Sequence, residues 1–484
     1  MKQNQEQAPL VEALGQYVNQ RTVRFDVPGH KGGRGNKFFR DFIGERAMQL
    51  DVNSMKPLDN LCHPTSVIQE ALDLAAQAFG AAACEFMVSG TTGAVQAMVM
   101  ATCKRGDKII LPRNVHRSAI NALVVCGAVP VYVNPGTDTK LGIALGMTLT
   151  DIQKAIQAHP DAKAILVNNP TYYGICSDLK GIVELAHQHG IKVLVDEAHG
   201  CHFYFGDDLP ISAMAAGADM AAVSVHKTGG SLTQSSILLL GPGVDRHYVR
   251  QVINLTQTTS ASYLLLASLD AARKNLVANG REIFQKSLQM AQYAREEINK
   301  LGDYYAYGPD LIDGQAVYDF DRTKLSIYTK GTGLTGIEVY DRLRDDYNIQ
   351  IELGDLANIL AILSAGDRLV DIERLIAALA DIQRDQADAD HSLIDFDYIE
   401  PQLKMTPQDA FYAECQALPL TQAAGRVSGE FIMAYPPGIP ILAPGELITE
   451  AVIAYTAYAK EKGCLVMGTE DPDVNTIYVV KEEA

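Results

Sequence analysis

Apolar residues between about positions 70 and 240 fall into short runs separated by segments with helical spacing. The runs, rich in Val, Ile and Leu, are KIILP, AVPVYV, AKAILVNN, IKVLVDEAH, AAVSVHK and SILLLG. Short continuous apolar runs are typical of strands buried on both faces of a sheet. Strands that alternate with helices predict an α/β fold with a mostly parallel sheet flanked by helices, whose ligands bind at the carboxyl ends of the strands.

The second half of the chain predicts further parts. The segment from YLLLASLD to EEINKL keeps a 3.6-residue period and predicts one long helix. After it, TKLSIYTKG, GIEVYDRLRDDYNIQIEL and ANILAILS predict a smaller α/β domain, and the polar run RDQADADHSLIDFD predicts a linker. The predicted parts are an N-terminal segment 1–30, a large domain 31–285, a small α/β domain 286–385 and a C-terminal domain 386–484.

The composition and net charge of the chain indicate which kinds of ligand and macromolecule it could bind. The chain has 484 residues, of which 47% are hydrophobic, and a formal net charge of −17. A negative surface potential disfavours nucleic acid and anionic membranes and favours cationic ligands. The most apolar long stretch, 78–103, is interrupted by Glu85 and SGTTG, so it does not predict a transmembrane helix. Eight cysteines without a CxxC pair, and no secretory signal pattern, predict reduced thiols in a cytoplasmic protein.

The strongest chemical signal is SVHKTGGSLTQSS, residues 224–236, at the predicted end of a strand. A lysine ε-amine attacks an aldehyde only when it is deprotonated, and burial or a nearby cation favours that form by lowering its pKa. Ser224, His226 and Ser235 flank Lys227 as candidate phosphate ligands. The alternative is a surface lysine that follows a strand.

A second signal is SGTTG at 89–93, between the strand-like EFMV and a helical segment. Free N–H groups and the helix dipole at such a position bind anions, so Gly90, Thr91 and Thr92 are candidate ligands of a single phosphate. The stretch matches neither GxGxxG nor GxxxxGK[ST], which weighs against dinucleotide and P-loop sites. The alternative is a plain turn into a helix.

Asp196 ends the run KVLVD, about one strand-helix-strand unit before Lys227. Gly90, Asn168, Asp196 and Lys227 all fall at predicted strand ends, and a carboxylate there can pair with a protonated ring nitrogen. A competing interpretation makes Asp196, Glu197, His199 and His202 ligands of zinc or iron.

With these residues in view, the chain resembles the Orn/Lys/Arg decarboxylases of pyridoxal 5'-phosphate (PLP) fold type I, over nearly its whole length. The most specific match is SVHKTGGSLTQSS, which fits the family signature Ser-x-His-Lys…Gln-Ser/Thr-Ser/Thr; PGHKGG at 28–33 and YPPGIP at 435–440 are also family-like. The resemblance, closest to short bacterial forms, implies decarboxylation of a basic amino acid, with arginine preferred and lysine or ornithine as alternatives. It also implies a homodimer or larger homo-oligomer.

The resemblance assigns residue roles. Lys227 would carry PLP, and Lys227 or His226 would return a proton to the substrate carbon. The other implied ligands of PLP are Thr91, Thr92, Ser224 and His226 at the phosphate, His116 stacked on the ring, Asp196 at the ring nitrogen and His199 at the phenolic oxygen. Two rival functions are an aminotransferase or α-oxoamine synthase and a silent regulatory homologue.

Two further predictions concern the edges of the site. In TQTTSASYLL, Ala261 stands where the family pattern has proline. By resemblance, Thr258, Thr259 and Ser260 lie near the dimer interface as candidate ligands of the neighbouring subunit's phosphate; the alternative is an ordinary helix cap. A buried guanidinium or ammonium needs an acidic partner, and Glu414 and Glu430 are the candidates, with Glu352 a third choice. The alternative is that all three are surface charges.

Overall fold

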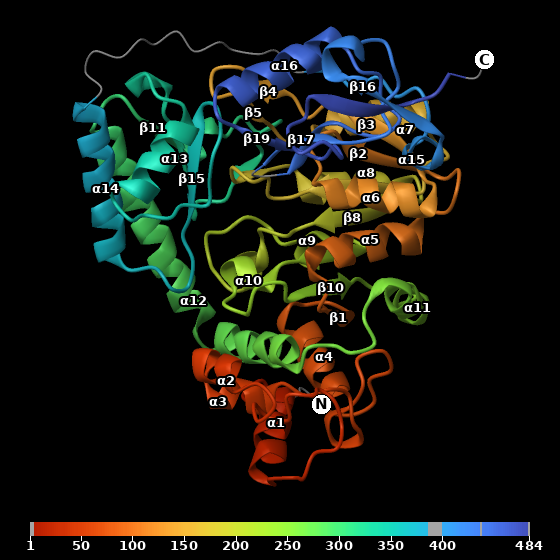
Figure 1. Ribbon diagram of the computed structural model, residues 1–484, viewed down its shortest axis with the longest axis vertical. Helices are drawn as coiled ribbons and strands as arrows, with labels where there is room; N and C mark the ends of the chain where they lie inside the picture. Colours follow the sequence, from red (N-terminus) through yellow and green to blue (C-terminus); the bar gives the residue numbers. More distant parts are fainter. Residues whose placement is uncertain (1–3, 386–398, 436–437, 483–484) are drawn as a thin grey trace. The chain divides into compact units, whose positions relative to one another are not determined.

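The computed structural model describes residues 4–385, 399–435 and 438–482 (Figure 1). The chain divides into two compact units, one of residues 1–101 with 194–284 and the other of residues 102–193 with 285–484. The predicted linker lies outside the described residues from residue 386 on, as do the two central prolines of YPPGIP. Within the described residues, no helix combines the length and hydropathy needed to cross a bilayer.

The first unit contains most of the residues of the predicted lysine site. Strand β8 pairs in parallel with β9, whereas β10 pairs antiparallel with both β9 and β1. The elements in chain order are α1 Pro9–Asn19, α2 Lys37–Ile43, α3 Glu45–Leu50, η1 Lys56–Leu58, α4 Val67–Ala78, β1 Ala83–Met87, α5 Gly90–Thr102, β8 Lys192–Asp196, η2 Cys201–Tyr204, α9 Ala213–Ala216, β9 Met220–Val223, α10 Val225–Thr228, β10 Ser236–Leu240, α11 Arg246–Thr256 and α12 Tyr263–Asn299, of which α5, β8 and α12 continue into the second unit.

The second unit begins with parallel strands, since β2 pairs in parallel with both β3 and β6. Its first elements are β2 Lys108–Pro112, α6 Arg117–Cys126, β3 Val129–Val133, β4 Thr137–Asp138, β5 Ile143–Ala144, α7 Leu149–Ala158, β6 Ala164–Asn168, β7 Ile175–Cys176 and α8 Leu179–Gln188. Helices α7 and α8 start at capping side chains, because Thr148 and Asp178 each accept a hydrogen bond from the backbone N–H three residues on.

The rest of the second unit contains the predicted smaller α/β pattern and a C-terminal segment. An antiparallel sheet, in the order β11-β13-β15-β14, packs with α13, α14 and the end of α12 around a common core. The elements are β11 Tyr305–Tyr307, η3 Pro309–Leu311, β12 Asp319–Phe320, β13 Lys324–Tyr328, η4 Lys330–Thr332, α13 Gly336–Asp345, β14 Leu353–Gly354, β15 Asn358–Ile362, α14 Leu369–Arg384, α15 Pro407–Tyr412, β16 Cys415–Pro419, η5 Leu420–Gln422, β17 Ile432–Tyr435, β18 Ile439–Leu442, α16 Glu450–Glu461, β19 Leu465–Met467 and β20 Thr476–Val480.

The structure confirms each predicted strand between residues 108 and 240 and corrects two details. Lys227 and His226 do not end a strand, because β9 stops at Val223 and both residues lie in the short helix α10, whose turn is closed by Lys227 N–H donating to Ser224 C=O. Strand β10 runs antiparallel to β9, so the sheet is mixed rather than wholly parallel.

Candidate active site

Strand pairing in the first unit brings Asp196 and the Lys227 segment to the same sheet edge. Asp196 is the last residue of β8, and its partner across the parallel ladder is Ala222, one residue before the end of β9. The carboxyl ends of parallel neighbours lie side by side, so the predicted ring-nitrogen ligand and the predicted nucleophile are placed together by register.

Lys227 has an imidazole partner. Its Nζ is 2.8 Å from Nε2 of His199, a hydrogen-bonding distance, and both residues come from segments that follow the two parallel strands. His226 Nδ1 lies 3.0 Å from the carbonyl oxygen of Ser235. The nucleophile candidate is therefore held by a specific partner, a finding that favours a functional lysine over a solvated surface residue.

Asp196 is buried, and its charge is only partly compensated. Burial raises the pKa of the Asp196 carboxyl above its ordinary value, and the nearby charge of Lys227 and a hydrogen bond from Ala198 N–H oppose that shift. A buried carboxylate whose pKa is raised gains stability from a further cationic or N–H partner. A protonated pyridine nitrogen is such a partner, so Asp196 fits the role that sequence reasoning assigned to it.

The 89–93 loop starts helix α5 and carries converging hydroxyl groups. Gly90 has a positive φ of 74°, a conformation that glycine adopts without strain. The hydroxyl of Thr91 bonds with that of Ser224 and lies 2.8 Å from that of Ser236, whereas Thr92 is exposed. Ser89 Oγ is buried without a hydrogen-bond partner among the described residues, and a Cβ at Gly93 would collide with it.

The hydroxyls of Ser89, Thr91, Ser224 and Ser236 are better explained as ligands of a phosphate than as parts of a core that holds no ligand. An unpartnered buried hydroxyl costs free energy unless a ligand or water satisfies it, and the N-terminus of α5 favours an anion there. As phosphate ligands, sequence reasoning named Gly90, Thr91, Thr92, Ser224, His226 and Ser235 but not Ser89 or Ser236. Ser89 is the first residue of SGTTG, and Ser236 is the last residue of SVHKTGGSLTQSS. Their place within these two hydroxyl-rich motifs could have identified them as phosphate ligands.

The residues of the metal interpretation have separate partners. Glu197 accepts hydrogen bonds from Tyr204 O–H and Ala213 N–H, and burial raises the pKa of its carboxyl to about 8. His202 Nδ1 lies 3.3 Å from the hydroxyl of Thr228, the residue after Lys227. Within the described residues, no group of three or more His, Cys, Asp or Glu side chains is placed to hold a metal ion. Glu197 therefore anchors the loop that carries Asp196 and His199.

His116 belongs to the second unit, as does Asn168 at the end of β6. His116 is half-buried at the start of α6, where its Nδ1 accepts a hydrogen bond from Ser118 N–H and lies 2.9 Å from the Ser118 hydroxyl. The contact fixes the ring at a helix N-terminus. Its stacking role stays a prediction.

The acidic candidates for substrate recognition occupy different settings. Glu414 is exposed and pairs with Lys481, which lowers the pKa of its carboxyl. Glu430 is half-buried, and its two carboxylate oxygens accept backbone N–H groups of Glu470 and Tyr478, both at 2.7 Å. Glu352 is exposed.

The segment after α11 is exposed at all three predicted hydroxyl residues. Thr258, Thr259 and Ser260 lie at the surface, and Thr258 Oγ1 accepts a hydrogen bond from Ser260 N–H. Ala261 is buried. The hydroxyls are thus accessible to a partner, and their contact with a second subunit stays a prediction.

Comparison with solved structures defines the class of fold. The chain aligns over 98% of its length with 80% of the lysine decarboxylase of Francisella novicida, with a TM-score of 0.84 at 21% identity. The alanine–glyoxylate aminotransferase of a Nostoc species aligns with 67% of the chain and 88% of its own length, at a TM-score of 0.52 and 17% identity. The chain has the α/β fold of the PLP fold type I enzymes, as its sequence predicted.

Sequence comparison then identifies the family. Residues 8–370 match the major domain of the Orn/Lys/Arg decarboxylases, and residues 394–479 match their C-terminal domain. An arginine decarboxylase of Bacillus subtilis is 48% identical over 485 residues, which cover 99% of each chain, and one of Halalkalibacterium halodurans is 48% identical over 99% of this chain and 98% of its own. The chain belongs to the Orn/Lys/Arg decarboxylase family.

Proposed function

We propose that the protein is a PLP-dependent decarboxylase that converts arginine to agmatine. The observation that carries the proposal is the placement of Lys227 against His199, with Asp196 and the Thr91–Ser224–Ser236 hydroxyls in the same compact unit. The choice of arginine is supported by the names of the relatives that are 48% identical. Lysine or ornithine decarboxylation is the alternative, and another fold type I reaction, such as transamination, is a more remote one.

PLP at this site would supply an electron-withdrawing ring that stabilises the charge left on the substrate Cα when CO2 departs. Lys227 would hold the cofactor through its ε-amine, and Ser89, Thr91, Ser224 and Ser236 would bind its phosphate. Asp196 would keep a proton on the ring nitrogen. His199 would orient the groups around Lys227 Nζ, from which it lies 2.8 Å away. Two residues, Lys227 and His226, are candidates to return a proton to the product carbon.

For the cationic end of the substrate, Glu414 and Glu430 are the proposed partners. A carboxylate can bind guanidinium with two parallel hydrogen bonds. Glu430 is the more constrained of the two, because both of its oxygens already accept backbone N–H groups. The carboxylate of Glu414 pairs with the exposed side chain of Lys481. Of the two, Glu414 therefore needs the smaller rearrangement to accept a substrate.

The direct test of the function is to incubate the purified, PLP-loaded protein with arginine, lysine or ornithine and identify the amine released. We expect agmatine from arginine, with a kcat/KM above those for the other two amino acids. Faster release of cadaverine or putrescine would change the substrate assignment but not the reaction. Formation of an α-keto acid without CO2 would instead support transamination and contradict the proposal.

We also propose that the protein is a homodimer or a larger homo-oligomer. Residues 23–43 of the first unit expose seven large apolar side chains: Val23, Phe25, Val27, Phe38, Phe39, Phe42 and Ile43. Phe25 is 95% exposed and Phe38 is 87% exposed. A contiguous sequence segment with such exposure is typical of an interaction surface, and burial of each phenylalanine would contribute about 2 kcal/mol.

Sedimentation at low micromolar concentration should therefore show no monomer. Phe42→Asp should release monomers, because a carboxylate would be buried without a partner in the interface. Val370→Asp is a matched control, since Val370 is 56% exposed on α14 and belongs to the other unit. An active wild-type monomer under these conditions would contradict a site completed by Thr258, Thr259 or Ser260 of a second subunit.

The proposed compartment is the cytoplasm. All eight cysteines are free thiols, four of them buried. Free thiols are typical of reducing compartments, where disulfides are rare.

A further inference from the structure

Strand β1 leads directly into the 89–93 loop, and among the described residues it is an edge strand that pairs with β10 alone. An edge strand leaves one row of backbone N–H and C=O groups unpaired along its free side. The last residues of β1 therefore need partners on that side if the loop that follows is to hold one conformation.

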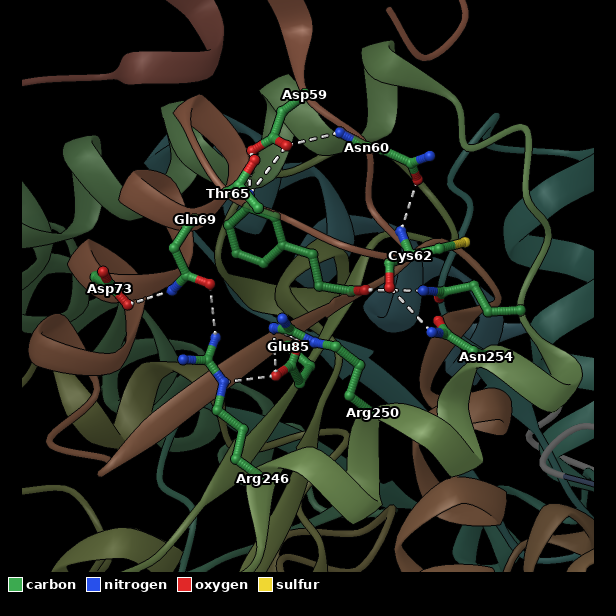
Figure 2. Close-up of polar contacts among 12 residues, drawn as sticks. Asp59, Asn60, Cys62, Thr65, Gln69, Asp73, Glu85, Arg246, Arg250 and Asn254 are labelled. Atoms are coloured by element: carbon green, nitrogen blue, oxygen red, sulfur yellow. Dashed lines mark hydrogen bonds and ion pairs between the residues drawn. The ribbon is translucent and has the colours of Figure 1, made fainter. Parts of the chain in front are cut away.

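Helix α11 is fastened to β1 by ion pairs (Figure 2). The buried carboxylate of Glu85 accepts hydrogen bonds from Arg246 Nε at 2.8 Å and from Arg250 Nη2 at 2.7 Å. Two guanidinium groups one turn apart on the helix thus bind one carboxylate in the middle of the strand. Arg250 donates to both Glu85 oxygens, which fixes the helix along the strand as well as across it.

The C-terminal end of α11 is held by a second contact shown in Figure 2. Asn254 Nδ2 donates to the carbonyl oxygen of Cys62 at 3.0 Å. The loop around Cys62 is itself ordered by Asp59, whose carboxylate accepts N–H groups of Asn60, Thr65, Ser66 and Ile68. Burial alone would raise the pKa of Asp59, but these four donors lower it below its usual value. The helix end therefore rests on a well-ordered loop.

Directly after α11, the side-chain amide of Gln257 binds backbone groups on the free side of β1, as a neighbouring strand would. Its Oε1 accepts a hydrogen bond from Val88 N–H at 3.2 Å, and its Nε2 donates to Phe86 C=O at 3.4 Å. The C=O of one strand residue and the N–H of the residue two positions on face the same side of a strand, so one primary amide can satisfy both as a backbone peptide would. Gln257 is only 7% exposed.

The carbonyl group of Val88 is bound by a second glutamine, Gln234. Gln234 Nε2 donates to it at 2.6 Å, from a residue within the lysine motif whose φ of 80° is positive. Val88 is the residue before Ser89, so both of its backbone polar groups are bound by side chains just where the phosphate loop begins. Gln257 also connects β1 to the segment of the predicted subunit contact, because the residues that follow it in the chain are Thr258, Thr259 and Ser260.

We propose that Gln257 is a positioning residue for the phosphate of PLP: its amide completes the free edge of β1 and so sets the conformation of loop 89–93. The inference rests on the proposed function, since it assigns the phosphate to that loop. Because α11 and the 258–260 segment are continuous with Gln257, the geometry of the phosphate loop depends on the segment that carries the predicted subunit-contact hydroxyls.

The test compares two ligands that differ only in the phosphate, PLP and pyridoxal, on the full-length apoenzyme. Gln257→Met keeps the length of the side chain and removes both hydrogen bonds. We expect it to weaken PLP binding by about tenfold or more, the effect of leaving buried polar groups unpaired. Pyridoxal binding should stay within about twofold of wild type, because the contacts of Lys227 and Asp196 are unchanged.

Gln251→Met and Gln251→Glu are the matched controls. Gln251 lies on α11 and is exposed, and its side chain bonds to that of His247, so neither change should alter the ratio of PLP to pyridoxal affinity. If Gln257→Met does not fold, Gln257→Glu replaces it, since it keeps an acceptor for Val88 N–H and turns a carboxylate oxygen instead of a donor toward Phe86 C=O. The same selective loss of PLP affinity is expected for this variant.

An equal loss of affinity for PLP and pyridoxal would show a general structural role and overturn the inference, as would unchanged affinity for PLP. Either result leaves the proposed function standing if the wild type binds PLP on Lys227. Failure of the wild-type protein to bind PLP at all would overturn both.

Discussion

Replacement of Lys227 by alanine should lower kcat for arginine by at least about a thousandfold and leave PLP without a covalent attachment. The reason is that the proposed reaction uses the ε-amine both to hold the cofactor and as a candidate proton donor, and loss of one such group alone costs about 10²–10⁴-fold. His199 would also lose its 2.8 Å contact with Lys227 Nζ.

The measurement is borohydride reduction of the purified protein followed by peptide mapping, together with steady-state kinetics. The pyridoxyl group should be found on Lys227 in the wild type and be absent from the variant. Lys274→Ala, an exposed lysine of α12, is the control and should keep wild-type labelling and rate. Label on a lysine other than Lys227 would overturn the assignment of the site.

Replacement of Asp196 by asparagine should separate cofactor binding from catalysis. Asparagine keeps the shape of the side chain and its hydrogen bond from Ala198 N–H, so PLP should still bind. It cannot stabilise a protonated ring nitrogen, and we expect kcat to fall by about a hundredfold or more, the range seen when one preorganised electrostatic contact is removed.

The occupancy of PLP, measured by absorbance, and kcat should be compared in the same preparation. Asp207→Asn is a suitable control, because Asp207 is exposed and pairs with Arg281 at the surface of the same unit. Near-normal turnover of Asp196→Asn at full occupancy would mean that another residue holds the ring nitrogen.

Much of the architecture could be read from local patterns. The apolar runs KIILP, KVLVD and SILLLG became β2, β8 and β10, and the periodic segment after residue 263 became the single helix α12. These features depend on neighbours within a few residues, namely side-chain size, period and turn chemistry, which a sequence displays directly. The end of the strand before Lys227 was misplaced, because Ser224 to Thr228 form a helical turn stabilised by its own backbone contacts.

The acidic residues illustrate the opposite case. Sequence reasoning chose Glu414 and Glu430 as acidic partners for a cationic substrate, but it could not assign their own contacts. Glu430 meets the N–H groups of Glu470 and Tyr478, which lie 40 and 48 residues further on. Burial raises the pKa of its carboxyl, and these two backbone contacts oppose the shift. Partners so distant in sequence are set by the packing of strands and loops.

The sequence by itself determined the fold class and the strands between residues 108 and 240, because these depend on local pattern, and an uninterrupted motif singled out Lys227 for a role that stays a prediction. Only the tertiary structure decided which atoms meet. It placed Thr91 against Ser224 and Ser236, turned β10 antiparallel to β9, and brought Gln257 to the free edge of β1. Contacts between residues more than a hundred positions apart depend on strand register and helix packing, and these are properties of the whole fold that no short segment encodes.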